Sequence, residues 1–188
     1  MPANEHKIVL VGDTNVGKSS IAFRFTKDRF FENTEPTIGA AFLTKKLLYN
    51  EIEYVLNLWD TAGQEKYNSL IPMYYRNANA AIIVYDVTNE RSLNSASRWL
   101  NELQTVAPDI FIILVGNKCD LEKQISQTTI NTYINKHNIK HLEVSAKTNH
   151  NINEIFELIL PNLVINDENA PLVHQIEKLA NYDNNCRC

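Results

Sequence analysis

The sequence predicts an α/β domain with a mostly parallel sheet, and three observations predict it. A short apolar strand, KIVLVG, leads into a glycine-bounded loop. Two further runs, AAIIVYDV and IFIILVGN, are apolar almost throughout, as strands are when both faces of their sheet are covered. Between these runs, Leu93, Ala96, Leu100 and Leu103 recur at the spacing of an amphipathic helix. Strands that alternate with helices are typical of α/β folds, whose ligands bind at the carboxyl ends of the strands.

The segments after the first strand predict a helix and then a strand pair. The run SSIAFRFTKD is expected to be helical, because Ile21 and Phe25 lie four residues apart. Residues 41–49 and 52–59 read as two strands joined near Asn50. The second of these strands should present two different faces, since side chains alternate along a strand. One face carries Tyr54, Leu56 and Leu58, and the other carries Val55, Asn57 and Trp59.

The second half of the chain predicts three helices and one more strand. The helix between the two apolar strands should end near Pro108. A helix around Ile130 precedes the strand HLEVS, and the last helix has the most regular apolar spacing, from Ile152 to Leu160. The periodicity fades after about Ile165. We therefore expect a folded domain over residues 1–165 and a flexible tail over residues 166–188.

Composition and cysteine usage argue against several classes of protein. A net charge of −4 and a pI near 5.7 disfavour nucleic-acid binding. No apolar run approaches the roughly 20 residues of a membrane-spanning helix, and MPANEHK does not resemble a signal peptide. Three cysteines make a poor disulfide framework and indicate a reducing compartment. The five histidines are scattered without metal-ligand spacing.

The loop after the first strand has the pattern of a phosphate-binding loop. Its sequence, GDTNVGKS, fits G-x-x-x-x-G-K-[ST] and lies between a predicted strand and a predicted helix. An ordinary glycine turn is the alternative, but a chance match has odds on the order of one in a few hundred. Backbone N–H groups and the helix N-terminus would face an anion, while Lys18 reaches its phosphates. The candidate residues are Gly12, Asp13, Thr14, Asn15, Val16, Gly17, Lys18, Ser19 and Ser20.

Two later loops indicate that the base is guanine. A phosphate-binding loop alone leaves ATPases, small-molecule kinases and GTPases open. In GNKCD, Asp120 can accept hydrogen bonds from guanine N1–H and its amine, whereas adenine offers an acceptor at N1. Asn117 would brace this loop, and the Lys118 stem could lie over the base. Taken alone, NKCD also fits a polar loop and SAK says little, but their order after strand ends favours a guanine site. The backbone N–H groups of SAK, which is Ser145, Ala146 and Lys147, could meet guanine O6.

A third motif, WDTAGQE, follows the predicted strand over residues 52–59. The Ser19 hydroxyl can ligate Mg²⁺, and Asp60 suits the second contact to this ion, through water. Gly63 lets a backbone N–H approach the terminal phosphate, and Gln64 can orient an attacking water. The candidate catalytic residues are therefore Gln64 and Lys18.

These motifs together resemble the Ras superfamily of small GTPases. The phosphate loop, PTIGAAF, DTAGQE, NKCD and SAK occur in this order, and the resemblance covers about residues 5–165. It implies a P-loop NTPase small-GTPase fold: a six-stranded, mostly parallel sheet with one antiparallel edge strand and helices on both faces. It also implies that Thr37 completes the Mg²⁺ shell with Ser19 and Asp60 when GTP is bound, and that Phe30 stacks against guanine.

The resemblance implies a switch with slow GTP hydrolysis. Loss of the terminal phosphate would release Thr37 and Gly63 from their common anchor. No residue is obviously an arginine finger in cis, so we expect an exchange factor, a GTPase-activating protein and effectors as partners of a monomeric domain. Thr14 stands where Ras-like proteins carry glycine. A pseudo-GTPase scaffold is the alternative function, and an ATPase or nucleoside kinase is a third that NKCD disfavours.

Further segments resemble the Rab family within this superfamily. They are IGAAF, LWDTAGQE, YYRNA and IVYDVT, and PTIGAAFLTKKL is most similar to the early-endosomal Rab group. The resemblance implies a role in vesicle trafficking on the cytoplasmic face of endosomal membranes, with cycling through the cytosol. Asn77 departs from the usual glycine of YYRGA, so the helix before it could end differently. The implied effector surface is Ile38, Phe42, Trp59 and Tyr74. In isolation, each of the three aromatic residues would read as a core residue.

The chain ends in NNCRC, which calls for an explanation in an acidic protein. A metal pair, a reactive dithiol or an idle tail are alternatives, but two ligands hold no metal alone. On a Rab-like domain, a terminal Cys-x-Cys resembles the signal for geranylgeranylation of Cys186 and Cys188. One lipid gives only marginal anchoring, and the tail lacks a polybasic patch, so a second lipid would supply stable membrane binding. The implied partners are a prenylation escort and a GDP-dissociation inhibitor.

Overall fold

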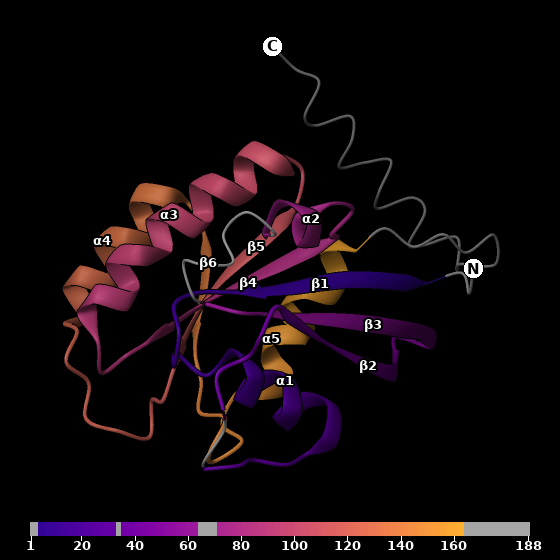
Figure 1. The fold of residues 1–188 in the computed structure, drawn as a ribbon, viewed down its shortest axis with the longest axis horizontal. Coiled ribbons are helices and arrows are strands. Elements are labelled where there is room, and N and C mark those ends of the chain that lie inside the picture. Colours follow the sequence, from indigo (N-terminus) through magenta and orange to yellow (C-terminus); the bar gives the residue numbers. More distant parts are fainter. Residues whose placement is uncertain (1–3, 33–34, 64–70, 164–188) are drawn as a thin grey trace.

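A six-stranded sheet forms the centre of the molecule in the computed structural model, which describes residues 4–32, 35–63 and 71–163 (Figure 1). The strand order is β2-β3-β1-β4-β5-β6, and every pairing is parallel except that of β2 with β3. This confirms the mostly parallel sheet with one antiparallel edge strand. The elements are β1 (Glu5–Val11), α1 (Lys18–Lys27), β2 (Ala40–Tyr49), β3 (Ile52–Thr61), α2 (Ile71–Tyr75), β4 (Ala80–Asp86), α3 (Glu90–Val106), β5 (Phe111–Asn117), α4 (Gln127–His137), β6 (Lys140–Glu143), α5 (Ile152–Ile159) and the 3₁₀ turn η2 (Leu160–Asn162).

The edge of the sheet is a hairpin of β2 and β3. The register pairs Tyr49 with Ile52, which leaves Asn50 and Glu51 as the two turn residues. Both turn residues have positive φ, 49° and 63°, as a two-residue turn that matches strand twist requires. The predicted alternation along β3 is confirmed. Tyr54, Leu56 and Leu58 are buried, whereas Val55, Asn57 and Trp59 are half-buried.

Helices cover both faces of the sheet, as expected, and each face has its own apolar core. Helices α1 and α5 lie on one face of the sheet (Figure 1). The rings of Phe25 in α1 and Phe156 in α5 stack on each other. Helices α2, α3 and α4 lie on the other face, where the Trp99 side chain of α3 is fully buried. Every residue of β4 is buried, which explains its unbroken apolar sequence.

The loops that follow the parallel strands lie together at the carboxyl ends of these strands, because parallel strands share a direction. They are the segments after β1, β3, β4, β5 and β6. Asn77 lies between α2 and the start of β4, at the amino ends of the strands, and has a φ of 58°. Asparagine tolerates this left-handed conformation, so the chain reversal usually made by glycine forms here without it.

Several predicted features lie outside the described residues. These are Gln64, Cys186, Cys188 and the tail over residues 166–188. Within the described ranges, no helix combines the length and the apolar character that crossing a membrane demands.

Candidate nucleotide-binding site

A cavity of about 540 Å³ opens at the carboxyl edge of the sheet. It draws on the loop after β1, the segment between α1 and β2, and the loops after β3, β5 and β6. Most of the predicted nucleotide-binding residues line this cavity, whereas Gly12, Asp13, Val16 and Ser145 do not. The predicted residues that line it are Thr14, Asn15, Gly17, Lys18, Ser19, Ser20, Phe30, Thr37, Gly63, Asn117, Lys118, Asp120, Ala146 and Lys147.

The phosphate loop curls around the amino group of Lys18. Its Nζ donates hydrogen bonds to the carbonyl oxygens of Gly12 at 2.9 Å and Asp13 at 2.8 Å. Lys18 is only 6% exposed, and burial lowers its pKa to about 8, although Asp60 and Asp13 act in the opposite direction. A cation that is held by carbonyl dipoles and poorly hydrated is well placed to receive anionic phosphate oxygens.

Two close contacts explain why glycine is needed beside this loop. Gly17 has a φ of 95°, and a side chain there would place Cβ 2.1 Å from the Asn117 amide nitrogen. A side chain on Gly63 would place Cβ 2.5 Å from the backbone of Asp13 and Thr14. Gly63, which follows β3, therefore lies directly against the phosphate loop. A phosphate group bound by the phosphate loop would also be close to Gly63.

Oxygen groups from three separate elements meet beside the phosphate loop. The Ser19 hydroxyl donates to Asp60 Oδ2 at 2.5 Å and lies 3.0 Å from Thr37 Oγ1. Thr37 donates to the same carboxylate oxygen at 3.2 Å. Burial raises the pKa of Asp60, against the hydrogen bonds from Ser19 and Thr37 and the charge of Lys18.

This cluster has the chemistry of a magnesium site. Asp60 is 1% exposed, and its Oδ1 atom has no hydrogen-bond partner among the described residues. A buried carboxylate oxygen without a partner is costly unless a cation binds it. Two hydroxyls and one carboxylate are hard oxygen ligands of the kind that Mg²⁺ takes together with phosphate oxygens. No group of three or more His, Cys, Asp or Glu in the described ranges offers a competing metal site.

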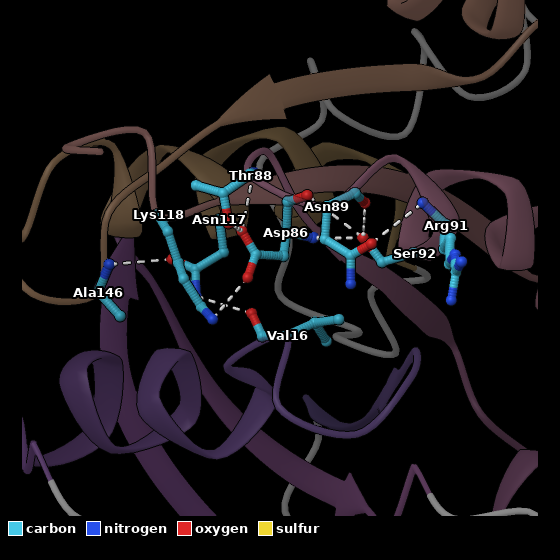
Figure 2. Close-up of polar contacts among 9 residues, drawn as sticks. All are labelled: Val16, Asp86, Thr88, Asn89, Arg91, Ser92, Asn117, Lys118 and Ala146. Carbon is cyan, nitrogen blue, oxygen red and sulfur yellow. Dashed lines mark hydrogen bonds and ion pairs between the residues drawn. The ribbon is translucent and has the colours of Figure 1, made fainter. Parts of the chain in front are cut away.

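Asn117 joins three loops at the base of the cavity. Its side-chain nitrogen donates to the Val16 carbonyl at 2.9 Å, and its oxygen accepts from the Ala146 backbone N–H at 3.2 Å (Figure 2). It is 2% exposed. Val16 does not line the cavity. Its carbonyl connects the phosphate loop, through Asn117, to the loops after β5 and β6.

The side chains of Lys118 and Asp86 form an ion pair of 2.6 Å (Figure 2). Asp86 ends β4 and is held in turn by the backbone N–H and the hydroxyl of Thr88, at 2.9 Å and 2.7 Å. The amino group of Lys118 is therefore held by Asp86, and Lys118 lines the cavity. This arrangement leaves its alkyl stem free to cover one face of a flat ligand.

Asp120 is braced by the loop after β6. The buried Ser145 hydroxyl donates to its Oδ1 at 2.6 Å and accepts from the Thr148 N–H at 3.1 Å. Ser145 does not line the cavity itself, so it acts through Asp120. The exposed carboxylate of Asp120 is thereby held at the lining of the cavity.

The cavity includes residues that the sequence did not single out. Phe31, Glu32, Glu35, Pro36 and Leu121 line it, and Glu32 lies 3.6 Å from the Lys147 amino group. No spacing pattern marks these positions. Asp86 did carry a signal, because it stands at the carboxyl end of a buried strand.

An aromatic surface lies beside the cavity, over β2, β3 and α2. Trp59 packs against Phe42 with ring centroids 5.3 Å apart and against Tyr74 at 6.0 Å. The amino group of Lys7 lies 4.6 Å above the Trp59 ring. Ile38 is 82% exposed and Phe42 55% exposed. The structure thus brings Phe42, Trp59 and Tyr74 together, and it leaves the apolar side chains of Ile38 and Phe42 exposed.

Comparisons with known proteins agree with the geometry. A family model described as "Ras family" matches residues 7–164. The chain is 50% identical over 167 residues to GTP-binding protein ypt5 of Schizosaccharomyces pombe, covering 86% of this chain and 79% of the relative. It is 48% identical over 153 residues to Ras-related protein RABF2b of Arabidopsis thaliana, covering 80% and 76%. They give no support to the pseudo-GTPase alternative. The chain belongs to the Ras family, as a Rab-type small GTPase that binds and hydrolyses GTP and acts as a switch in vesicle trafficking.

Proposed function

We propose that this GTPase works with Mg²⁺ on endosomal membranes, anchored there by two prenyl groups. The observation that carries the switch is the meeting of Ser19, Thr37 and Asp60 beside the phosphate loop. These residues come from α1, from the segment before β2 and from the end of β3. One terminal phosphate can therefore fix two loops at once, and its loss releases both.

Ser19, Thr37 and Asp60 would hold the metal ion. The support is the buried, unpartnered Oδ1 of Asp60 together with two hydroxyls. When bound, the ion offsets negative charge on the β- and γ-phosphate oxygens. Thr37 joins this set only when a γ-phosphate is present, which makes its position report on the nucleotide.

Hydrolysis is assigned to positioning and charge stabilisation, with no covalent intermediate. Lys18, which is held at the Gly12 carbonyl, would meet the phosphate oxygens from within the loop. Gly63 lies against the backbone of the phosphate loop, so its N–H would reach the terminal phosphate. Gln64 orients the attacking water; this role rests on the motif, since Gln64 lies outside the described residues. Ras itself hydrolyses GTP at about 3–5 × 10⁻⁴ s⁻¹ and about 10⁵-fold faster with an activating protein. We expect the same dependence here.

The guanine base is read by the loops after β5 and β6. Asp120 accepts from N1–H and the exocyclic amine, and the stem of Lys118 covers one face of the ring. Phe30 also lines the cavity, where it would stack edge-on against guanine. In the loop after β6, the Ser145 N–H donates to the His150 carbonyl and the Ala146 N–H donates to Asn117. The Lys147 N–H is therefore the one that would donate to O6.

Membrane attachment is assigned to the tail over residues 166–188. Geranylgeranyl groups on Cys186 and Cys188 would give stable binding that one lipid does not. A prenylation escort delivers the chain, and a GDP-dissociation inhibitor carries it through the cytosol. The check is the cytosolic fraction of Cys186→Ser and Cys188→Ser, each expected to rise well above that of the unaltered chain. Full membrane binding by both single variants contradicts the two-lipid proposal.

The endosomal assignment rests on the resemblance of PTIGAAFLTKKL to the early-endosomal Rab group. The exposed surface of Ile38, Phe42, Trp59 and Tyr74 would bind effectors there in the GTP state.

An experiment in cells tests this assignment. A fluorescent copy that carries Gln64→Leu is followed in cells given a short pulse of a fluid-phase endocytic tracer. We expect it on tracer-positive vesicles within the first minutes, and we expect a Cys186→Ser, Cys188→Ser double variant in the cytosol. Recruitment to membranes that the tracer never enters contradicts the endosomal proposal.

A further inference from the structure

The guanidinium group of Arg24, in the last turn of α1, contacts the loop that would read guanine O6. Its Nε donates to the Ala146 carbonyl at 2.9 Å, and one terminal nitrogen donates to the Lys147 carbonyl at 3.1 Å. The other terminal nitrogen donates to the backbone and carboxylate oxygens of Asp28, both at 3.1 Å. The side chain is only 15% exposed, although it is charged. The planar guanidinium of Arg24 therefore donates hydrogen bonds to two separate segments, the loop after β6 and the C-terminal end of α1.

These contacts determine where the backbone donors of the loop point. A trans peptide bond holds its C=O and its N–H in opposite directions, and no peptide bond in the described residues is cis. Since the Ala146 carbonyl faces Arg24, the N–H of the same peptide unit, which belongs to Lys147, faces away from it, toward the cavity that Lys147 lines. A hydrogen bond from a cation also polarises the peptide and strengthens that N–H as a donor.

The second set of contacts reaches the other wall of the cavity. Asp28 ends α1 in the left-handed conformation, with its N–H bonded to the Arg24 carbonyl. Two residues later, Phe30 lines the cavity. Arg24 thus links the wall that carries Phe30 to the wall that carries Ala146 and Lys147.

We propose that Arg24 is a positioning residue for guanine recognition: it aims the Lys147 N–H at O6 without touching the nucleotide. The proposal rests on guanine nucleotides being the ligands of this cavity. It goes further by assigning O6 selectivity to a side chain on α1, outside the NKCD and SAK motifs.

Ligands altered at single atoms separate this role from a merely structural one. In 6-thio-GDP, sulfur replaces O6 and accepts hydrogen bonds weakly, while N1–H and the amine remain. In IDP, the amine that Asp120 reads is missing and O6 remains. The affinities of GDP, 6-thio-GDP and IDP are measured by competition on the full chain, on Arg24→Met and on Lys27→Met. Lys27 is an exposed residue of the same helical turn and serves as the matched control.

Loss of the guanidinium should weaken GDP binding by about tenfold, as expected for one well-placed hydrogen bond. The 6-thio-GDP affinity should fall less, so that the preference for GDP over 6-thio-GDP narrows, while the preference for GDP over IDP stays constant. Lys27→Met should change neither ratio. An equal loss for all three ligands overturns the proposal, because it indicates general loosening. Failure of the unaltered chain to bind GDP contradicts the proposed function itself and is a different outcome.

A second variant covers the case in which Arg24→Met does not fold. Arg24→Lys keeps the charge but lacks the fork, so it cannot hold both carbonyls. It should narrow the same GDP over 6-thio-GDP preference. Full retention of that preference by a folded Arg24→Lys overturns the proposed role of the fork.

Discussion

The hydroxyl of Ser19 donates a 2.5 Å hydrogen bond to the carboxylate of Asp60, across a sequence separation of 41 residues. Ser19 lies in the first turn of α1, which follows the phosphate loop, and Asp60 lies one residue before the end of β3. The hydroxyl of Thr37 donates a hydrogen bond to the same carboxylate. A metal ion bound among these groups would tie nucleotide binding to the positions of two loops.

Removal of one hydroxyl should expose this dependence on the metal. In Ser19→Ala, GDP should dissociate at least about tenfold faster, the equivalent of 1.4 kcal/mol, because one oxygen ligand is lost. A chelator, which should strongly accelerate release from the unaltered chain, should then have little further effect. Release of a fluorescent GDP analogue with and without chelator measures both. Ser95→Ala on α3 is the control, and an equal response to chelator in all three proteins contradicts a metal site at Ser19.

Replacement of Asp120 by asparagine should change base selectivity rather than simply abolish binding. The carboxylate accepts from N1–H and the amine of guanine, whereas asparagine offers one acceptor and one donor. Xanthine presents N1–H beside a carbonyl at the amine position, so Asp120→Asn should prefer XDP. We expect a loss of GDP affinity that approaches about 10⁴-fold. Competition between GDP and XDP decides this, and unchanged preference for GDP would show that Asp120 does not read the base edge.

Gln64→Leu should trap the GTP state. Leucine cannot orient water, so single-turnover hydrolysis should slow by at least about tenfold, which is 1.4 kcal/mol in the barrier. Affinity for GTP should be unchanged, because the change affects the attacking water and not the phosphate contacts. Gln104→Leu, at an exposed position of α3, should hydrolyse GTP at the rate of the unaltered chain. Equal single-turnover rates for the Gln64→Leu and Gln104→Leu proteins contradict the assigned role.

The fold was predictable from the sequence because burial leaves periodic patterns. The unbroken apolar run of β4 and the alternation along β3 each follow from which faces of the sheet are covered. The glycine-bounded loop was predictable for a different reason. Only glycine fits at position 17, because its φ is positive and a side chain would collide with Asn117. A loop of this shape therefore needs glycine at this position, which makes the motif visible in the sequence.

Long polar side chains were not predictable in the same way. Arg24 donates to the loop after β6, but its partners there lie far away in the sequence, and no periodicity records such contacts. Helical spacing reveals only that Arg24 stands in the last turn of α1. Which carbonyls it meets depends on how α1 packs beside the loop after β6, and that requires the folded structure.

The folded chain should lose stability below neutral pH in part through His141. Burial lowers the pKa of this imidazole, with Lys123 acting in the same direction and Glu143 against it. The unfolded chain therefore takes up the proton first, near its ordinary pKa of about 6.5. The stability due to the neutral ring is complete above that pH and is lost as the pH falls through the folded-state pKa. The ring also lies 3.0 Å from the Tyr85 hydroxyl.

Chemical denaturation between pH 7 and 5, at a fixed excess of GDP, measures this effect. His141→Gln, which has no titrating ring, should lose less stability over that range than the unaltered chain. His150→Gln, at an exposed position, should follow the unaltered chain. A His141→Gln protein with the full pH dependence shows that other groups cause the acid sensitivity.

Amide hydrogen exchange in the two nucleotide states tests the switch most directly. The chain is compared with GDP and with a non-hydrolysable GTP analogue, both with Mg²⁺, and peptides over residues 30–42 and 60–76 are followed against β5 as an internal reference. If one phosphate holds both loops, exchange in these two segments should slow in the triphosphate state while exchange in β5 stays constant. Identical exchange of both segments in the two states would contradict the account.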